Sequence, residues 1–151
     1  MNYMTKNITR SALLLAIIFF YANLGIAQNA IDKEWPQKVN ESFNNTFPAA
    51  SDLKWELKGE LYQIEFDNNR SKGHFVLMDK SGNIVKHEEE IPKADLPEVV
   101  IRNINTKYTT YNIDSVKKIT ENDLVSYLIS LESSNGELEV HYTQSGDELE
   151  N

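Results

Sequence analysis

The sequence contains one pattern twice, and this repetition constrains the fold more than any other feature. In the first copy, Leu53–Phe66 reads LKWELKGELYQIEF and alternates apolar and polar residues on both sides of Gly59. Alternation with a period of two, with a glycine where the chain reverses, is typical of a β-hairpin. A second and less regular copy, Val116–Leu131, reads VKKITENDLVSYLISL. The sequence therefore predicts two hairpins of the same design.

An apolar stripe with a spacing of four residues precedes each hairpin. This spacing places the members of a stripe on one face of an α-helix. Pro97 suits a first helical turn, and Asp95 and Glu98 are expected to form a capping box at the start of the second helix. The two stripes are Trp35, Val39, Phe43 and Phe47 and, at one constant offset, Leu96, Val100, Ile104 and Tyr108.

Further short strands are predicted after each hairpin, with matching turns between them. Ser81-Gly82 and Ser145-Gly146 occupy corresponding turns of the two copies. Ile91–Ala94 is interpreted as a linker, because Pro92 cannot donate to a strand ladder. The predicted strands are His74–Asp79, Ile84–Glu89, Glu137–Tyr142 and a short last strand at Leu149.

These repeats predict an α+β fold of two tandem units, each a helix followed by four antiparallel strands. One unit alone would bury its sheet face poorly. Side by side, the units would form one sheet of about eight strands, with both helices packed on one face and the opposite face open. The expected boundaries are 28–91 for the first unit and 92–151 for the second. The alternative is a chance similarity between two generic α+β patterns.

Residues 1–27 have the features of a signal peptide. Lys6 and Arg10 give a positive start, and Ser11–Tyr21 is an apolar run that is short for a membrane span. Gly25 and Ala27 then offer small residues at the −3 and −1 positions of a cleavage site before Gln28. We expect export to the periplasm or beyond, with no stable membrane insertion after cleavage. An uncleaved N-terminal anchor is the alternative.

The composition excludes several classes of function. The chain has 151 residues, with 23 acidic against 15 basic side chains. Such a charge balance opposes binding to nucleic acid, which needs clustered Lys and Arg. Cysteine is absent, which rules out disulfides, thiol catalysis and Cys-ligated metals.

The repeated motif resembles the β-lactamase-inhibitor-like, PepSY-like domain family of Bacteroidetes envelope proteins. The resemblance implies export and two helix-plus-sheet units. It also implies protein binding, because the similar β-lactamase inhibitor protein binds its enzyme with an open, concave sheet face. The present chain lacks the cysteines of that inhibitor, and Lys118 is expected at the place of Trp55. The residues that carry the resemblance are Trp35-Pro36, Phe43, Phe47-Pro48, Trp55, Tyr62–Phe66 and Ser81-Gly82, then Leu96-Pro97, Val100, Tyr108, Tyr127 and Ser145-Gly146.

Motifs for catalysis, metals and cofactors were not found. His74, His87 and His141 lack metal-site spacing, and strand parity places His74 and His141 on opposite faces. No serine triad or glycine-rich phosphate loop occurs. Asp79–Asn83, with Glu90, resembles a fragment of a calcium loop, although a β-turn explains it more simply. We therefore expect no enzyme activity, no metal and no cofactor.

Strand parity divides the predicted sheet into a core face and an open face. The open face should carry polar residues, yet several large apolar ones share its parity, which is typical of a contact surface. Phe75 and Leu77 could instead pack under a loop or against the neighbouring unit. Trp55 has core parity, but a bulge could turn it outward. The predicted core residues are Tyr62, Ile64, Phe66, Val76, Met78, Tyr127, Ile129, Leu131, Val140 and Tyr142. The candidate partner-binding residues are Phe75, Leu77, Leu128, Trp55, Leu61 and His141.

Two functions remain open from the sequence. The first is a non-enzymatic binding module that holds an unidentified protein or peptide on the open sheet face. The more specific version of this hypothesis is an inhibitor of an envelope hydrolase. The alternative is a structural envelope protein, or one that buffers calcium or a small ligand through its acidic loops.

Overall fold

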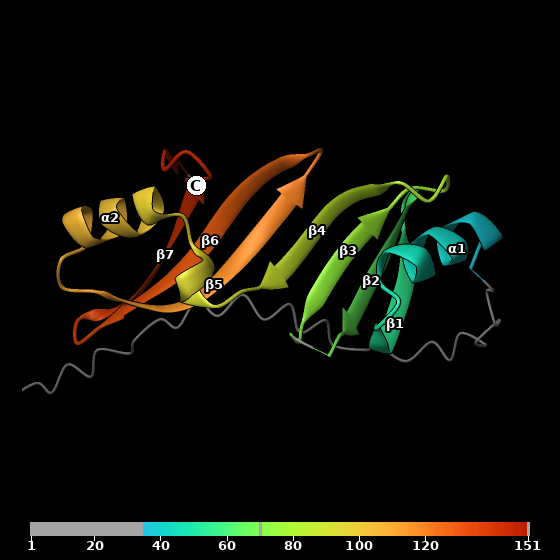
Figure 1. Ribbon diagram of the computed structural model, residues 1–151, viewed down its shortest axis with the longest axis horizontal. Helices are drawn as coiled ribbons and strands as arrows, with labels where there is room; N and C mark the ends of the chain where they lie inside the picture. Colours follow the sequence, from blue (N-terminus) through green and yellow to red (C-terminus); the bar gives the residue numbers. More distant parts are fainter. Residues whose placement is uncertain (1–34, 70, 151) are drawn as a thin grey trace, which may run out of the picture. The chain divides into compact units, whose positions relative to one another are not determined.

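The computed structural model describes residues 35–69 and 71–150, which belong to one compact unit. The predicted signal peptide, 1–27, lies outside the described residues. The described residues form two α-helices, a short 3-10 helix and an eight-stranded sheet (Figure 1). The elements are α1 (Gln37–Thr46), β1 (Ser51–Lys58), β2 (Leu61–Asp67), β3 (His74–Met78), β4 (Ile84–Glu90), η1 (Lys93–Asp95), α2 (Glu98–Lys107), β5 (Asn112–Glu121), β6 (Leu124–Ser133), β7 (Gly136–Thr143) and β8 (Glu148–Leu149).

The sheet is continuous and antiparallel, with its strands in chain order from β1 to β8. The two units meet where β4 pairs with β5, in a register that runs from Lys86 opposite Glu121 to Glu90 opposite Lys117. The predicted α+β fold, with two helix-plus-strand units in one sheet, is confirmed. None of the helices in the described part of the chain is long and apolar enough to cross a membrane.

Both helices pack on the same face of the sheet. Cross-strand partners share a face, so the register can be followed from one unit to the other. Val76 lies opposite His87, which lies opposite Thr120, which in turn lies opposite Val125. Val76 packs with α1, and Val125 packs against the cluster below α2. The opposite face of the sheet is therefore free of both helices.

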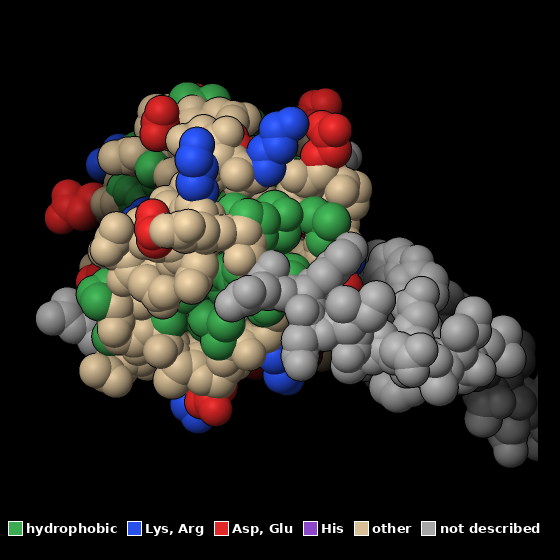
Figure 2. Space-filling model, turned by 90° about the vertical axis from the view of Figure 1, so that its right-hand side faces the viewer, with side chains coloured by type: hydrophobic (Ala, Val, Ile, Leu, Met, Phe, Trp, Pro, Cys, Tyr) green, Lys and Arg blue, Asp and Glu red, His purple; other side chains and the backbone are tan. Residues whose placement is uncertain are grey.

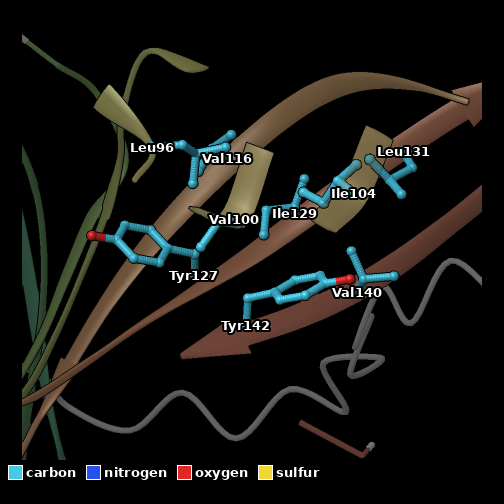
Figure 3. Close-up of a cluster of buried hydrophobic side chains, with 9 residues drawn as sticks. All are labelled: Leu96, Val100, Ile104, Val116, Tyr127, Ile129, Leu131, Val140 and Tyr142. Atoms are coloured by element: carbon cyan, nitrogen blue, oxygen red, sulfur yellow. The ribbon is translucent and has the colours of Figure 1, made fainter. Parts of the chain in front are cut away.

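Each helix covers one end of the sheet and buries its own apolar cluster. Val39 and Phe43 of α1 are buried against four side chains of β2 and β3, namely Ile64, Phe66, Val76 and Met78. Leu96, just before α2, and Val100 and Ile104 of α2 are buried against Val116, Tyr127, Ile129, Leu131, Val140 and Tyr142 (Figure 3). Neither helix lies over β4 (Figure 1). All ten predicted core residues face the helices, and only Tyr62 is half-buried rather than buried.

The predicted capping box at the second helix is wrong. The N-cap of α2 is Pro97, which makes no side-chain hydrogen bond, and Asp95 lies in the 3-10 turn η1. Two prolines fix the backbone around this turn, with Pro92 before it and Pro97 after it, and they leave Asp95 too far from the helix to cap it. Residues predicted as a linker therefore contribute to η1.

The predicted correspondence between Trp55 and Lys118 is also wrong. Trp55 lies opposite Ile64, and Val116 lies opposite Ile129. Because Ile64 and Ile129 are equivalent, Val116 is the counterpart of Trp55, and Lys118 lies one step further along the same face. The second hairpin is longer than the first, so a comparison of the two repeats by sequence alone misaligns these positions.

Candidate functional site: the open face of the sheet

Apolar side chains from the central strands lie on the open face. Phe75 and Leu77 alternate along β3 with the buried Val76 and Met78, and both are half-buried. Leu128 of β6 is half-buried too. Because the helices pack on the other face, neither helix covers these side chains. Their role in binding a partner stays a prediction. The strand register places them on the open face, where the prediction put them.

Ile119 is another apolar residue of the open face, and sequence reasoning missed it. It lies on β5 between Glu88 and Ser126 in the same cross-strand row, and only 8% of it is exposed. Val116, three residues earlier, is buried on the helix side. β5 thus carries apolar residues on both faces, so its sequence does not show a regular alternation of apolar and polar residues. The odd spacing between Val116 and Ile119 was the available signal.

A charged triad lies beside Ile119. Glu88 contacts the ammonium groups of Lys86 at 2.8 Å and Lys117 at 3.3 Å. Partial burial of Glu88 opposes its ionisation, but the hydrogen bonds and charges of the two lysines outweigh burial and hold its pKa below the usual range. Glu88 is therefore ionised near neutral pH. The triad adds fixed charges to the apolar centre of the open face.

A shallow hollow of about 710 Å³ reaches the open face at the ends of β1 to β4. Lys54, Glu65, Phe75 and Glu88 follow one another along a single cross-strand row in its wall. Lys117 adds a second positive charge. The hollow combines the rings of Phe66 and Phe75 with charges of both signs, a set that suits contact with a protein better than with a nucleic acid.

The structure brings some of the predicted partner-binding residues together. Leu128 and His141 are directly opposite each other on β6 and β7, and His141 Nε2 lies 2.9 Å from Ser126 Oγ. Phe75 and Leu77 share β3, whereas Leu61 lies toward the β1 edge, opposite Lys58. The candidate surface is therefore a band across the middle strands, and Leu61 lies at its margin.

Trp55 does not belong to this surface. Its ring lies edge-to-face on Trp35, 5.4 Å between centroids, and packs against the cluster below α1. The register irregularity in β1 falls between Ser51 and Lys54, before Trp55, so it does not turn the ring outward. The suggestion that Trp55 could reach the open face is therefore wrong, and its core parity holds.

The edge strand β1 leaves two apolar side chains exposed. Leu53 and Leu57 are 41% and 43% exposed. Figure 2 views the end of the molecule that carries α1 and β1, and hydrophobic side chains reach the surface there between charged ones. Leu57 lies opposite Tyr62 and hence on the helix-covered face. It is a useful control for substitutions on the open face.

The residues compared with a calcium loop form a closed turn. One carboxylate oxygen of Asp79 accepts hydrogen bonds from the backbone N–H groups of Ser81, at 2.8 Å, and Asn83, at 3.0 Å. The other accepts from the Asn83 side-chain amide at 2.8 Å. Glu90 lies at the far end of β4, opposite Lys117. The carboxylate of Asp79 is thus engaged within its own turn, as a β-turn requires.

Two of the three histidines meet on the helix side of the sheet. His74 and His141 are on opposite faces, as predicted, but His74 Nδ1 lies 3.1 Å from His87 Nε2. Burial is the main reason that the pKa of His87 is lowered. No sequence spacing marks this pair, because it depends on the register between β3 and β4.

Comparison with known proteins places the chain among proteins of the same fold. A structure from Bacteroides fragilis described as a BLIP-like protein is 19% identical, with a TM-score of 0.61 over 76% of this chain and 82% of that one. A structure from Bacteroides eggerthii described as a putative periplasmic protein is 15% identical, with a TM-score of 0.65 over 78% and 87%. A DUF2874 family protein from Bacteroides ovatus is 19% identical, with a TM-score of 0.63 over 78% and 86%. At these identities the likeness shows the fold alone.

The comparison with curated proteins gave no match. One family model, described as "Putative beta-lactamase-inhibitor-like, PepSY-like", matches the chain twice, over residues 28–86 and 71–149. Its description names no catalytic activity. These two matches cover most of the sequence and both helix-plus-strand units, and the chain therefore belongs to the PepSY-like, β-lactamase-inhibitor-like family.

Proposed function

We propose that this chain is an exported, non-enzymatic module that binds a protein partner on the open face of its sheet. The observation that carries the proposal is the set of large apolar side chains on the face opposite both helices. Phe75, Leu77 and Leu128 are half-buried there, and Ile119 lies among them. An apolar centre with charged groups around it is the usual anatomy of a protein interface.

The sequence of the N-terminus and the similar proteins support a location and a kind of partner. The sequence of residues 1–27 has signal-peptide features, and the similar protein from Bacteroides eggerthii is described as periplasmic. The family description and the BLIP-like relative favour an enzyme as partner. We therefore propose a periplasmic or secreted location, with an envelope hydrolase as the partner that is inhibited.

A face-specific binding experiment tests the proposal. The chain without residues 1–27 would be immobilised, and proteins captured from the envelope of the source organism would be identified and then titrated individually. A Phe75→Ser, Leu77→Ser variant should bind the captured partner at least about tenfold more weakly, since buried interface anchors each contribute more than about 1 kcal/mol. Leu57→Ser, on the helix-covered face, is the matched control and should bind as the unsubstituted chain does.

Stability measurements keep this test decisive. Each variant should retain its far-ultraviolet circular dichroism spectrum and unfold well above the assay temperature. Unchanged affinity of the folded Phe75→Ser, Leu77→Ser variant would overturn the open-face proposal. Equal loss of affinity in the Leu57→Ser control would do the same. For the inhibitor proposal, the purified chain should reduce the hydrolytic rate of the captured enzyme in a saturable manner.

A further inference from the structure

We propose that His74, His87 and Glu89 form a binding site for a divalent transition-metal ion that favours imidazole ligands, with Zn²⁺ as the test ion. The site lies on the helix side of the sheet, on strands β3 and β4. It is thus separate from the open face on which the proposed function rests. Three ligands from the protein leave one position of a tetrahedral ion for water or another ligand.

The strand register brings these three residues together. Val76 lies opposite His87 and Phe75 opposite Glu88, so one further step along the ladder places Glu89 beside His74. His87 and Glu89, two residues apart on one strand, point to the same face. A sequence search for helical histidine spacing cannot detect such a site, because its ligands come from two arms of a hairpin.

The distances between donor atoms suit a single ion. His74 Nδ1 and His87 Nε2 are 3.1 Å apart, and the donor atoms of all three residues lie within 4.8 Å of one another. Two nitrogens bound to tetrahedral Zn²⁺ at roughly 2.0–2.1 Å would lie about 3.3 Å apart. The two rings lie nearly in line, so each would turn by roughly 35° to direct its nitrogen lone pair at a shared ion.

Aromatic packing holds the two imidazoles in place. Phe66 stacks on His74, with 4.8 Å between ring centroids, and Phe47 lies edge-on to His87 at 5.2 Å. The two imidazole rings are themselves nearly parallel, with an interplanar angle of 14°. Only 2% of His74 is exposed. Packing of this kind limits the orientations that each ring can take up, and so reduces the ordering that an ion must impose on binding.

Two polar neighbours control the protons of His74. Its Nε2 lies 2.7 Å from Ser71 Oγ and 2.8 Å from the amide nitrogen of Asn68, whose oxygen accepts a hydrogen bond from the Ser71 N–H. Without an ion, Nε2 therefore accepts, and Nδ1 donates its proton to His87. On binding, Nδ1 releases its proton to solvent and Nε2 takes one up from solvent. The Nε2–H then donates to the Ser71 hydroxyl, and the Asn68 amide N–H, which is also a donor, must turn away from Nε2. The net charge of the ring is unchanged.

Lys118 is the competitor for the third ligand. Its ammonium group lies 3.2 Å from a carboxylate oxygen of Glu89 and neutralises it in the absence of an ion. A bound cation would take over this role, and the two positive charges would repel each other. Replacement of Lys118 by glutamine should therefore strengthen metal binding. A purely structural role of the His74–His87 pair would not produce that effect.

Calorimetric titration of the chelator-treated chain without residues 1–27 tests the site. Zn²⁺ should bind with one ion per chain, and Co²⁺ should give the visible absorption of a tetrahedral complex. His87→Asn and Glu89→Gln should each weaken Zn²⁺ binding about tenfold or more, and Lys118→Gln should strengthen it. The matched controls are His141→Asn and Glu90→Gln, which alter the third histidine and the adjacent carboxylate on the opposite face.

Each outcome decides for or against the site. Loss of Zn²⁺ binding in the site variants with retention in both controls would support it. No binding by the unsubstituted chain, or equal weakening in the controls, would overturn it. If His87→Asn does not fold, Glu89→Gln and Lys118→Gln keep the test intact, because both retain the buried rings and change affinity in opposite directions.

Discussion

Ser42 Oγ donates a hydrogen bond of 2.6 Å to the carbonyl oxygen of Gly82 and so connects α1 to the turn between β3 and β4. The second unit repeats this contact. Asn103 of α2 donates to the carbonyl oxygen of Gly146 at 2.8 Å, in the turn between β7 and β8. The Ser-Gly turns that mark the repeat in the sequence are therefore the places where each helix rests on its own sheet.

Gly82→Ala should destabilise the protein by about 3 kcal/mol. A Cβ at this position would lie 2.8 Å from the carbonyl oxygen of Lys38, at a φ of +85°. The backbone conformation costs roughly 1 kcal/mol for a non-glycine residue, and the forced shift of α1 adds roughly 2 kcal/mol. Urea unfolding measures the change in the free energy of unfolding.

Gly59→Ala is the matched control for that substitution. Gly59 also has a positive φ, of +63°, but nothing lies within 4 Å of the position that a Cβ would take. This variant should lose only the roughly 1 kcal/mol due to the backbone conformation. Equal losses for the two variants would show that close packing of α1 on the turn contributes nothing.

The local elements of the fold were readable from the sequence, because each depends on a short-range pattern. The predicted hairpin Leu53–Phe66 is formed by β1 and β2, and the spacing-four stripes placed Phe43 and Ile104 correctly in the core. Positive φ at Gly59 agrees with the predicted chain reversal. Alternation in a strand and periodicity in a helix follow from backbone geometry alone.

What the sequence did not reveal depends on the register between strands. The open-face position of Ile119 follows from its partners Glu88 and Ser126, which no local pattern specifies. The contact between His74 and His87 likewise follows from the pairing of β3 with β4. A shift by one residue would move each of these side chains to the other face. Candidate sites on a sheet therefore need the register before they can be assembled.

Glu148→Gln should weaken the dependence of stability on acidic pH. Burial opposes ionisation of Glu148, but hydrogen bonds from Lys107, Tyr108 and Tyr142 outweigh burial and lower its pKa below 4.5. A carboxyl with a depressed pKa stabilises the fold above its unfolded pKa, and this contribution is lost as pH falls through the folded value. The variant lacks that contribution, so urea midpoints between pH 5 and pH 3 should fall less steeply.

The dependence of stability on alkaline pH provides a second test of the contact between Tyr142 and Glu148. Burial and the hydrogen bond to Glu148 raise the pKa of Tyr142 from 10.0 to about 12. The neutral phenol thus stabilises the fold, and this contribution is lost as pH rises above the unfolded pKa of 10.0. Tyr142→Phe should remove that loss between pH 10 and pH 12. If the loss of stability between pH 10 and pH 12 is unchanged in this variant, the raised pKa of Tyr142 is contradicted.

Asp123→Gly should stabilise the second hairpin by up to about 1 kcal/mol. Asn122 and Asp123 have φ values of +48° and +66° in the turn between β5 and β6. Two successive positive φ angles are typical of a type I′ turn, for which Asn-Gly is the preferred sequence. Asp123→Ala is the control and should be less stable than the unsubstituted chain, because alanine tolerates this region poorly. Urea midpoints should therefore rank glycine above aspartate and aspartate above alanine.

Ile104→Ala should destabilise the whole sheet and not only the half that contains α2. Ile104 is 1% exposed, and removing its side chain should cost about 2–5 kcal/mol. Both tryptophans of the chain, Trp35 and Trp55, pack in the other cluster, below α1. The ladder between β4 and β5 joins the two units through five residue pairs, so we expect one cooperative transition. In urea unfolding, the substitution should therefore shift the midpoint followed by tryptophan fluorescence as far as the midpoint followed by circular dichroism. A fluorescence midpoint that stays in place while circular dichroism shifts would show that the units unfold independently.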